Sequence, residues 1–170
     1  MKIIVMSIDL SFSKSGWAIS VIDGGNPQLI ASGLLTSDKK LKPIHRIEKH
    51  ISDILKIYDI YKPNIIIKEA AIMGRSSTGL NVIKTHGAFE YRCHKLNIPV
   101  DEVHNQSIKA WARKQIIDHK KYDKKLIVAL AIEKYYNQRI SNIWTPRNRL
   151  IDDIADAIAI PMVWLNKMVA

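Results

Sequence analysis

The sequence feature that most constrains the fold is a short run of apolar residues, Ile65-Ile66-Ile67, which ends in Lys68-Glu69. A brief β-branched run without polar alternation is typical of a strand that is buried on both faces and flanked by helices. The stretch before it, residues 42–61, repeats its apolar residues at helical spacing, and Pro63 marks the end of that helix. The pattern therefore predicts an α/β protein with a central, covered strand at 65–69.

Three further strand patterns precede this unit and are joined by short connections. They cover residues 2–9, 16–22 and 28–35. The segment Asp23-Gly24-Gly25-Asn26-Pro27 between the second and the third is a strong turn signal. Strands that follow one another this closely are expected to pair as an antiparallel meander.

The second half of the chain alternates between helical and strand patterns. After a polar loop at 73–79 we expect a helix over 80–96, a strand over 99–103, and helices over 106–118, 123–137 and 149–167. Pro161 is expected to kink or split the last helix. This order predicts a single domain over 1–170, with a mixed five-stranded sheet that combines the antiparallel meander with parallel strands and carries helices on both faces.

The charge balance favours a polyanionic partner. The net charge is +10 and the isoelectric point is about 9.7, which suits phosphate contacts with a nucleic acid. No apolar run reaches the roughly 18 residues of a membrane span, so no membrane partner is expected. Residues 1–6 indicate a first strand and not a signal peptide. The single cysteine, Cys93, fits a reducing compartment, and we expect a cytoplasmic protein.

Carboxylates stand at the ends of the predicted strands. Asp9 ends the first strand and Glu69 ends the central one, while Asp152, Asp153 and Asp156 cluster at the start of the last helix. Sites in α/β sheets form at the carboxyl ends of strands, and adjacent parallel strands would bring Asp9 and Glu69 together. Any one of these residues has an ordinary explanation, as a turn residue or a helix cap. Their combination predicts an active site.

Four carboxylates in one place repel one another and therefore need a cation. A set of oxygen ligands suits Mg²⁺ or Mn²⁺. Two such ions, about 4 Å apart, can activate a water and stabilise the leaving oxygen of a phosphodiester. The residues themselves thus predict a nuclease that cuts a nucleic-acid backbone.

Three motifs, in this order, resemble those of the RuvC-type Holliday junction resolvases of the RNase H-like superfamily. The first is Ser7-Ile8-Asp9 with Gly16 seven residues after the aspartate. The second is the strand 65–69, which ends in Glu69. The third is Asp153-Ile154-Ala155-Asp156, which opens the final helix. The match covers essentially the whole chain, and small phage-encoded resolvases are the nearest group that the motifs suggest.

This resemblance implies an RNase H-like fold and a homodimer that makes paired nicks in four-way DNA junctions. It also implies catalysis by Asp9, Glu69, Asp153 and Asp156 with Mg²⁺ or Mn²⁺, two ions in each site, in phage-type recombination, repair or packaging. By position, Lys109 and Lys125 resemble lysines that contact phosphate, with Lys124 as a rival for Lys125. Further basic residues expected to contact DNA are Arg75, Arg113, Lys114, Lys120 and Lys121.

The chain departs from the family pattern at two places. Bacterial members have Asp-Pro-Gly at the first motif, where this chain has Asp9-Leu10-Ser11. They also carry an aromatic residue three positions after the glutamate, where this chain has Ile72. Ile72 and Met73 are then the apolar candidates for a wedge in the junction.

Two finer expectations concern the last helix and the helix over 80–96. Asp153 is expected to be the partner of Asp156, because their shared stripe continues into apolar residues and because the family motif aligns Asp153 rather than Asp152. Paired nicks across a two-fold junction require two symmetric sites, so a homodimer is expected. Its predicted interface is the helix over 80–96, through Leu80, Ile83, Gly87 and Tyr91.

Two alternatives stay open at this point. A ribonuclease acting on RNA–DNA hybrids would use a similar carboxylate set on the same fold. A non-catalytic protein would bind junctions without cutting them, although the retention of four acidic positions argues against it. An actin-like ATPase also places an Asp after a strand, but it needs two lobes, and 170 residues are too few.

Overall fold

The computed structural model describes residues 2–71 and 77–169. Its centre is a five-stranded sheet in the order β3-β2-β1-β4-β5. The strands are β1 (Ile3–Asp9), β2 (Lys14–Asp23), β3 (Asn26–Thr36), β4 (Ile65–Glu69) and β5 (Val100–Val103). The pairs β1–β2 and β2–β3 are antiparallel, whereas β4 pairs in parallel with both β1 and β5. The predicted mixed sheet is confirmed.

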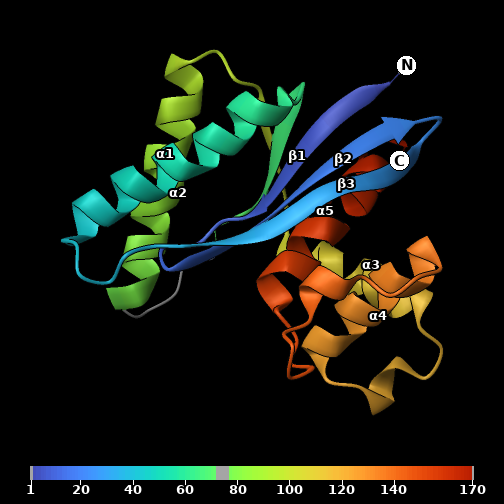
Figure 1. The fold of residues 1–170 in the computed structure, drawn as a ribbon. Helices are drawn as coiled ribbons and strands as arrows, with labels where there is room; N and C mark the ends of the chain where they lie inside the picture. The colour runs from blue at the N-terminus through green and yellow to red at the C-terminus, as the bar shows by residue number, and fades with distance from the viewer. Residues whose placement is uncertain (1, 72–76, 170) are drawn as a thin grey trace.

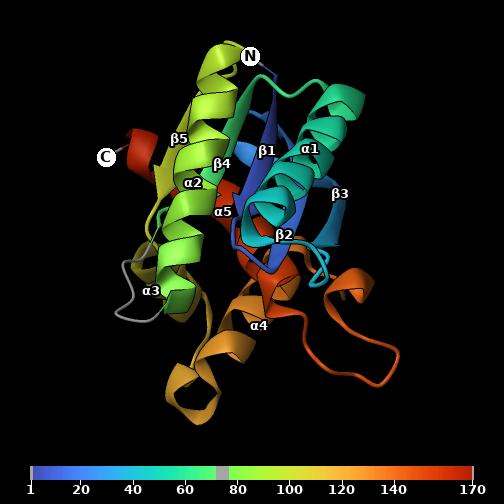
Figure 2. The same cartoon turned by 90° about the vertical axis from the view of Figure 1, so that its left-hand side faces the viewer.

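The described residues form five α-helices, which lie on both sides of this sheet (Figure 1). They are α1 (Pro43–Tyr61), α2 (Ser77–Lys95), α3 (Asn105–Gln115), α4 (Lys124–Tyr136) and α5 (Asp152–Val169). Figure 2 shows α1 and α2 together on one face. Helix α5 packs against the other face, and α3 and α4 lie outside α5. The expectation of helices on both faces is confirmed.

Side-chain alternation along the strands divides the core between these two faces. Met6, Ile8 and Ile66 pack with α1 and α2. Val5 and Ile67 pack in the second cluster, with α3, α4 and α5. Because neighbouring residues of a strand point to opposite faces, Asp9 and Glu69 belong to the α5 side.

Helix α5 lies deep inside the molecule. Every residue from Ala157 to Trp164 is buried. Three of its buried residues, Ala155, Ala157 and Ala159, have small side chains. The helix is continuous through Pro161, so the expected split does not occur. Packing on both sides, against the sheet and against α3 and α4, compensates for the backbone hydrogen bond that proline cannot make.

Several predicted boundaries were wrong by a few residues. Helix α2 begins at Ser77 and thus takes in the end of the predicted loop, and α3 ends at Gln115 instead of 118. The chain then turns through Asp118, whose φ of 56° is left-handed, into a 3-10 turn at His119–Lys121. A second 3-10 turn covers Ser141–Ile143. Within the described ranges, no helix is long and apolar enough to cross a membrane.

Candidate metal centre

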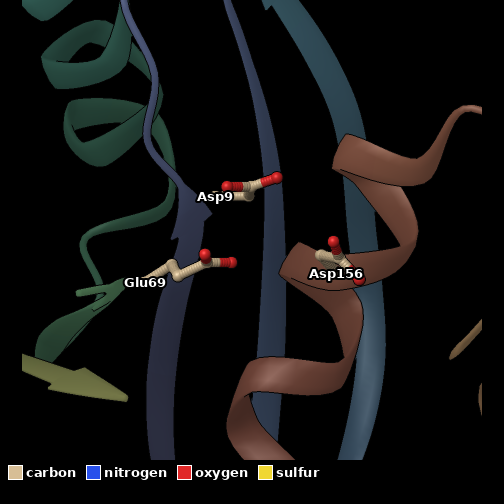
Figure 3. Close-up of side chains that lie close together, drawn as sticks. All are labelled: Asp9, Glu69 and Asp156. Atoms are coloured by element: carbon tan, nitrogen blue, oxygen red, sulfur yellow. The ribbon is translucent and has the colours of Figure 1, made fainter. Parts of the chain in front are cut away.

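Three carboxylates from different elements meet on the α5 side of the sheet. Asp9 ends β1, Glu69 ends β4, and Asp156 lies in the second turn of α5 (Figure 3). One oxygen from each lies within 4.8 Å of the others. Asp9 and Glu69 meet because β1 and β4 run in parallel, with Ile8 paired to Lys68 immediately before the two acids.

The third carboxylate reaches this point because β2 leaves room for the start of α5. Gly16 is paired with Asp9 across the β1–β2 ladder. A Cβ added to Gly16 would lie 1.8 Å from the backbone carbonyl oxygen of Asp153. Only glycine therefore lets the first turn of α5 rest on β2, and this contact places Asp156 one turn later, beside the strand ends.

Burial and mutual repulsion raise the pKa values of these acids. Burial is the larger cause of the raised pKa of Asp9, and the charges of Glu69 and Asp156 add to it. Burial, followed by the charges of Glu69 and Asp152, raises the pKa of Asp156 to about 7. Burial also raises the pKa of Glu69, against a hydrogen bond from Asn105 and the charge of Lys109. Without a cation this group holds protons near neutral pH.

The donor set fits a hard divalent cation. It consists of carboxylate oxygens from three residues, the ligand type that Mg²⁺ and Mn²⁺ prefer. The buried Oε2 of Glu69 has no hydrogen-bond partner within the described part of the chain. A buried carboxylate oxygen without a donor is costly unless a cation satisfies it. Asp9, Glu69 and Asp156 are therefore the residues that could hold a metal ion.

The fourth predicted acid, Asp153, is not part of this three-residue group. It lies in the first turn of α5 and is half-buried. Burial and the neighbouring Asp152 raise its pKa, whereas the charge of Lys14 opposes this shift. Asp152 instead forms a salt bridge with Lys125, with 2.5 Å between Oδ2 and Nζ. The two aspartates thus differ in surroundings, and the role expected for Asp153 stays a prediction.

The predicted basic residues that the structure describes fall into three groups. Lys109 is half-buried and close enough to the centre to lower the pKa values of Glu69 and Asp156. Lys125 and Lys121 are exposed and paired with Asp152 and Asp118. Exposed residues in the same region are Arg113, Lys114, Lys120 and Lys124. Ile72, Met73 and Arg75 lie outside the described residues.

Sequence reasoning overlooked two residues near this centre. Asn105, at the start of α3, donates a side-chain hydrogen bond to Glu69. It follows the third parallel strand, β5, so the rule that placed Asp9 and Glu69 could also have found it. Lys14, at the start of β2, is near enough to act on Asp153. No local signal marks Lys14, because only the packing of α5 on β2 brings it near.

Comparison with known proteins gives a consistent relationship. No protein-family model matches the chain. A crossover junction endodeoxyribonuclease RuvC of Prochlorococcus marinus (strain AS9601) is 26% identical over 163 residues, which are 96% of each chain. The structure of Thermus thermophilus RuvC in complex with a Holliday junction substrate superposes with a TM-score of 0.75, over 98% of this chain and 96% of the other, at 15% identity. The chain is RuvC-like in both sequence and fold.

This RuvC-like fold extends to a eukaryotic protein. The yeast mitochondrial Holliday junction resolvase Ydc2 superposes with a TM-score of 0.68 over 97% of this chain and 78% of its own, at 14% identity. At such identities the structural likeness concerns the fold. The expected RNase H-like architecture is therefore confirmed, whereas the nearness to phage proteins stays a prediction.

Proposed function

We propose that this chain is a metal-dependent, structure-selective DNA endonuclease that resolves four-way junctions, and other branched DNA, by paired nicks. The observation that carries the proposal is the convergence of Asp9, Glu69 and Asp156 at the carboxyl ends of parallel strands in a RuvC-like fold. The same chemistry is expected to include Asp153, one turn before Asp156. The whole of 1–170 is proposed to act as one nuclease domain.

The cofactor is proposed to be Mg²⁺ or Mn²⁺, with two ions in each site. When bound, such ions activate a water and stabilise the leaving oxygen of the phosphodiester. Asp9, Glu69 and Asp156, whose side chains converge in Figure 3, are the residues proposed to hold these ions. Asn105 holds the Glu69 carboxylate, and Lys109 offsets part of the negative charge that faces the DNA.

DNA is proposed to cross the side of the molecule that carries α3 and the turn before α4. Lys109, Arg113, Lys114, Lys120, Lys121, Lys124 and Lys125 contribute the positive charge. Arg75 as a phosphate contact, and Ile72 or Met73 as a wedge, complete the proposal. We propose a cytoplasmic role in recombination, repair or packaging of the phage type.

The working form is proposed to be a homodimer that associates through α2. Leu80 is 56% exposed and Tyr91 is 65% exposed on this helix. Gly87 is exposed between them, and a Cβ added there would meet nothing within 4 Å. An apolar, unobstructed helix face suits a two-fold contact, which would present two sites to a two-fold symmetric junction.

The decisive experiment compares the wild type with Glu69→Gln on a labelled four-way junction, a fork, a plain duplex and an RNA–DNA hybrid. Each is incubated with Mg²⁺, Mn²⁺ or a chelator. We expect paired nicks in the junction with metal, and no nicks from Glu69→Gln, which should still bind the junction. Glu48→Gln, on the exposed surface of α1, is the matched control and should cut normally.

Two other outcomes of this experiment would support the alternative functions, and a third would contradict the proposed active site. Preferred cutting of the hybrid would indicate a ribonuclease, whereas junction binding without cutting in any metal would indicate a non-catalytic binder. Nicking by Glu69→Gln at the wild-type rate would show that the carboxylate group is not the active site.

A further inference from the structure

The residues next to the two strand-end acids face the opposite side of the sheet. Asp9 and Glu69 point toward α5, so Leu10 and Lys68 lie toward α2. Leu10 packs in the core cluster of α1 and α2, and Lys68 contacts Glu90 of α2. Helix α2 therefore reaches the residue after one acid and the residue before the other.

The first contact comes from His86, which is 4% exposed. Its Nε2 lies 2.9 Å from the carbonyl oxygen of Leu10. Because a carbonyl can only accept, the ring donates from Nε2. Burial lowers the pKa of His86, which keeps the ring neutral with its single proton on that nitrogen. The backbone immediately after Asp9 is thus held by a side chain of α2.

The second contact lies one helical turn further along α2. Glu90 is four residues after His86 and so lies on the same helix face. The ammonium of Lys68 lies 3.0 Å from Oε1 of Glu90 and 2.5 Å from Oε2 of Glu102. The Lys68 side chain is 3% exposed, so removing either partner would leave its buried ammonium less well compensated. This cluster fixes the backbone immediately before Glu69.

Packing alone does not explain why position 86 carries a histidine. Its Nδ1 is buried and has no hydrogen-bond partner among the residues described. An apolar side chain would fill the same space without burying an unpaired nitrogen. The side-chain bond from His86 to Leu10 is directed at the Asp9 turn, which indicates that its position serves the geometry of the acids.

We propose that His86 is a positioning residue for the metal centre, acting with the Lys68–Glu90 ion pair so that α2 sets the spacing of Asp9 and Glu69. This inference rests on the proposed function. When a residue that orients a metal ligand without touching the metal is replaced, metal affinity typically falls by about 10-fold to 100-fold. The contact here runs through the backbone of Leu10, so the lower end of that range is expected.

The test measures the binding of Mn²⁺ alone to the purified protein by calorimetric titration, together with the melting temperature. His86→Leu removes the donor, and His86→Gln places an amide nitrogen near the position of Nε2. Thr85→Val is the matched control, because Thr85 is buried next to His86 and its hydroxyl donates to the Asn81 carbonyl oxygen within α2, not to the strand ends. We expect about tenfold weaker Mn²⁺ binding for His86→Leu and less than about a twofold change for the other two.

The outcomes separate the inference from the proposed function. Wild-type Mn²⁺ affinity in a folded His86→Leu protein, or an equal loss in Thr85→Val, would overturn the positioning role. If His86→Leu does not fold, the test uses Glu90→Gln, because the Glu90 side chain is 51% exposed and its replacement should leave the fold intact. We expect Glu90→Gln to bind Mn²⁺ about threefold more weakly. Unchanged Mn²⁺ affinity in this variant would overturn the inference. A wild-type protein that binds no Mn²⁺ would contradict the metal centre itself.

Discussion

The three acids of the proposed metal centre repel one another when they are ionised and no cation is bound. Asp9, Glu69 and Asp156 are at least partly buried, lie close together, and have pKa values above those of free side chains. Such acids destabilise the fold when ionised and bind a cation more strongly for the same reason. Function and stability are therefore expected to oppose each other at these positions.

This conflict makes stability depend on pH in a defined direction. The pKa of Asp156 is raised from 3.8 to about 7, so its protonated form stabilises the fold below about pH 4, and that contribution is lost as the pH rises to about 7. We therefore expect Asp156→Asn to be more stable than the wild type in chelator at pH 8, by a few kcal/mol, at about 1.4 kcal/mol per pKa unit. The difference should vanish near pH 4. Denaturant unfolding of both proteins across this range measures it, and a constant difference would contradict the assignment.

The two aspartates in the first turn of α5 are predicted to differ in importance. Asp153→Asn should lower the nicking rate by orders of magnitude, because Asp153 is half-buried beside the acidic group. Asp152→Asn should keep most activity, because Asp152 is paired with Lys125 near the surface and does not belong to the three-carboxylate group. Single-turnover rates on one junction decide the order. A more damaging Asp152→Asn would mean that Asp152 is the partner of Asp156.

At the scale of elements, the centre depends on how closely α5 approaches the sheet. The strands supply two acids at fixed positions through the parallel pairing of β1 and β4. The third comes from a helix whose height above β2 is set by Gly16 beneath the Asp153 carbonyl. A change in that contact would move Asp156 without altering any acid.

Gly16→Ala tests this dependence. The added methyl group would meet backbone atoms 1.8 Å away, so α5 must shift. We expect a loss of about 3 kcal/mol in the free energy of unfolding, at the upper end of the usual cost of overpacking, and about a hundredfold lower nicking. Gly87→Ala, where the methyl group meets open space, should retain the wild-type stability or exceed it. Equal stabilities for the wild type and Gly16→Ala in denaturant unfolding would refute the close contact.

At the scale of the whole molecule, α2 connects two proposed features. Its inner face contacts the ends of β1 and β4 through His86 and Glu90. Its outer face carries Leu80, Gly87 and Tyr91, the proposed dimer contact. The same helix would thus hold both the acids and the partner subunit, so that assembly and active-site geometry share one element.

The dimer is tested by placing a charge on this outer face. Tyr91→Glu should give a monomer in light scattering and replace paired nicks by single ones, because burying an unpaired carboxylate at an apolar contact is unfavourable. Ile44→Glu is the matched control, since Ile44 on α1 is also 65% exposed, and it should leave the mass unchanged. An unchanged dimer mass for Tyr91→Glu would move the interface away from α2.

The sequence by itself determined the strands, most helices and two of the acids. Alternation and β-branched runs are local properties, so Ile65–Glu69 could be assigned as a covered strand without any structure. Asp9 and Glu69 could be placed together because each ends a strand predicted to be parallel to the other. Boundaries were less certain, as at Ser77 and Gln115, because the ends of helices depend on what packs against them.

Only the tertiary structure determined how α5 is rotated about its axis and which side chains contact the ends of β1 and β4. Helical spacing allowed Asp152, Asp153 and Asp156 to face the sheet in several ways, and the contact of Gly16 with the backbone of α5 selected Asp156 for the three-residue group. Pro161 does not interrupt α5, because burial between sheet and helices outweighs the local preference of proline. Lys14 acts on Asp153, Asn105 on Glu69 and His86 on the backbone after Asp9, each across a long stretch of chain, and sequence periodicity carries no information about such contacts.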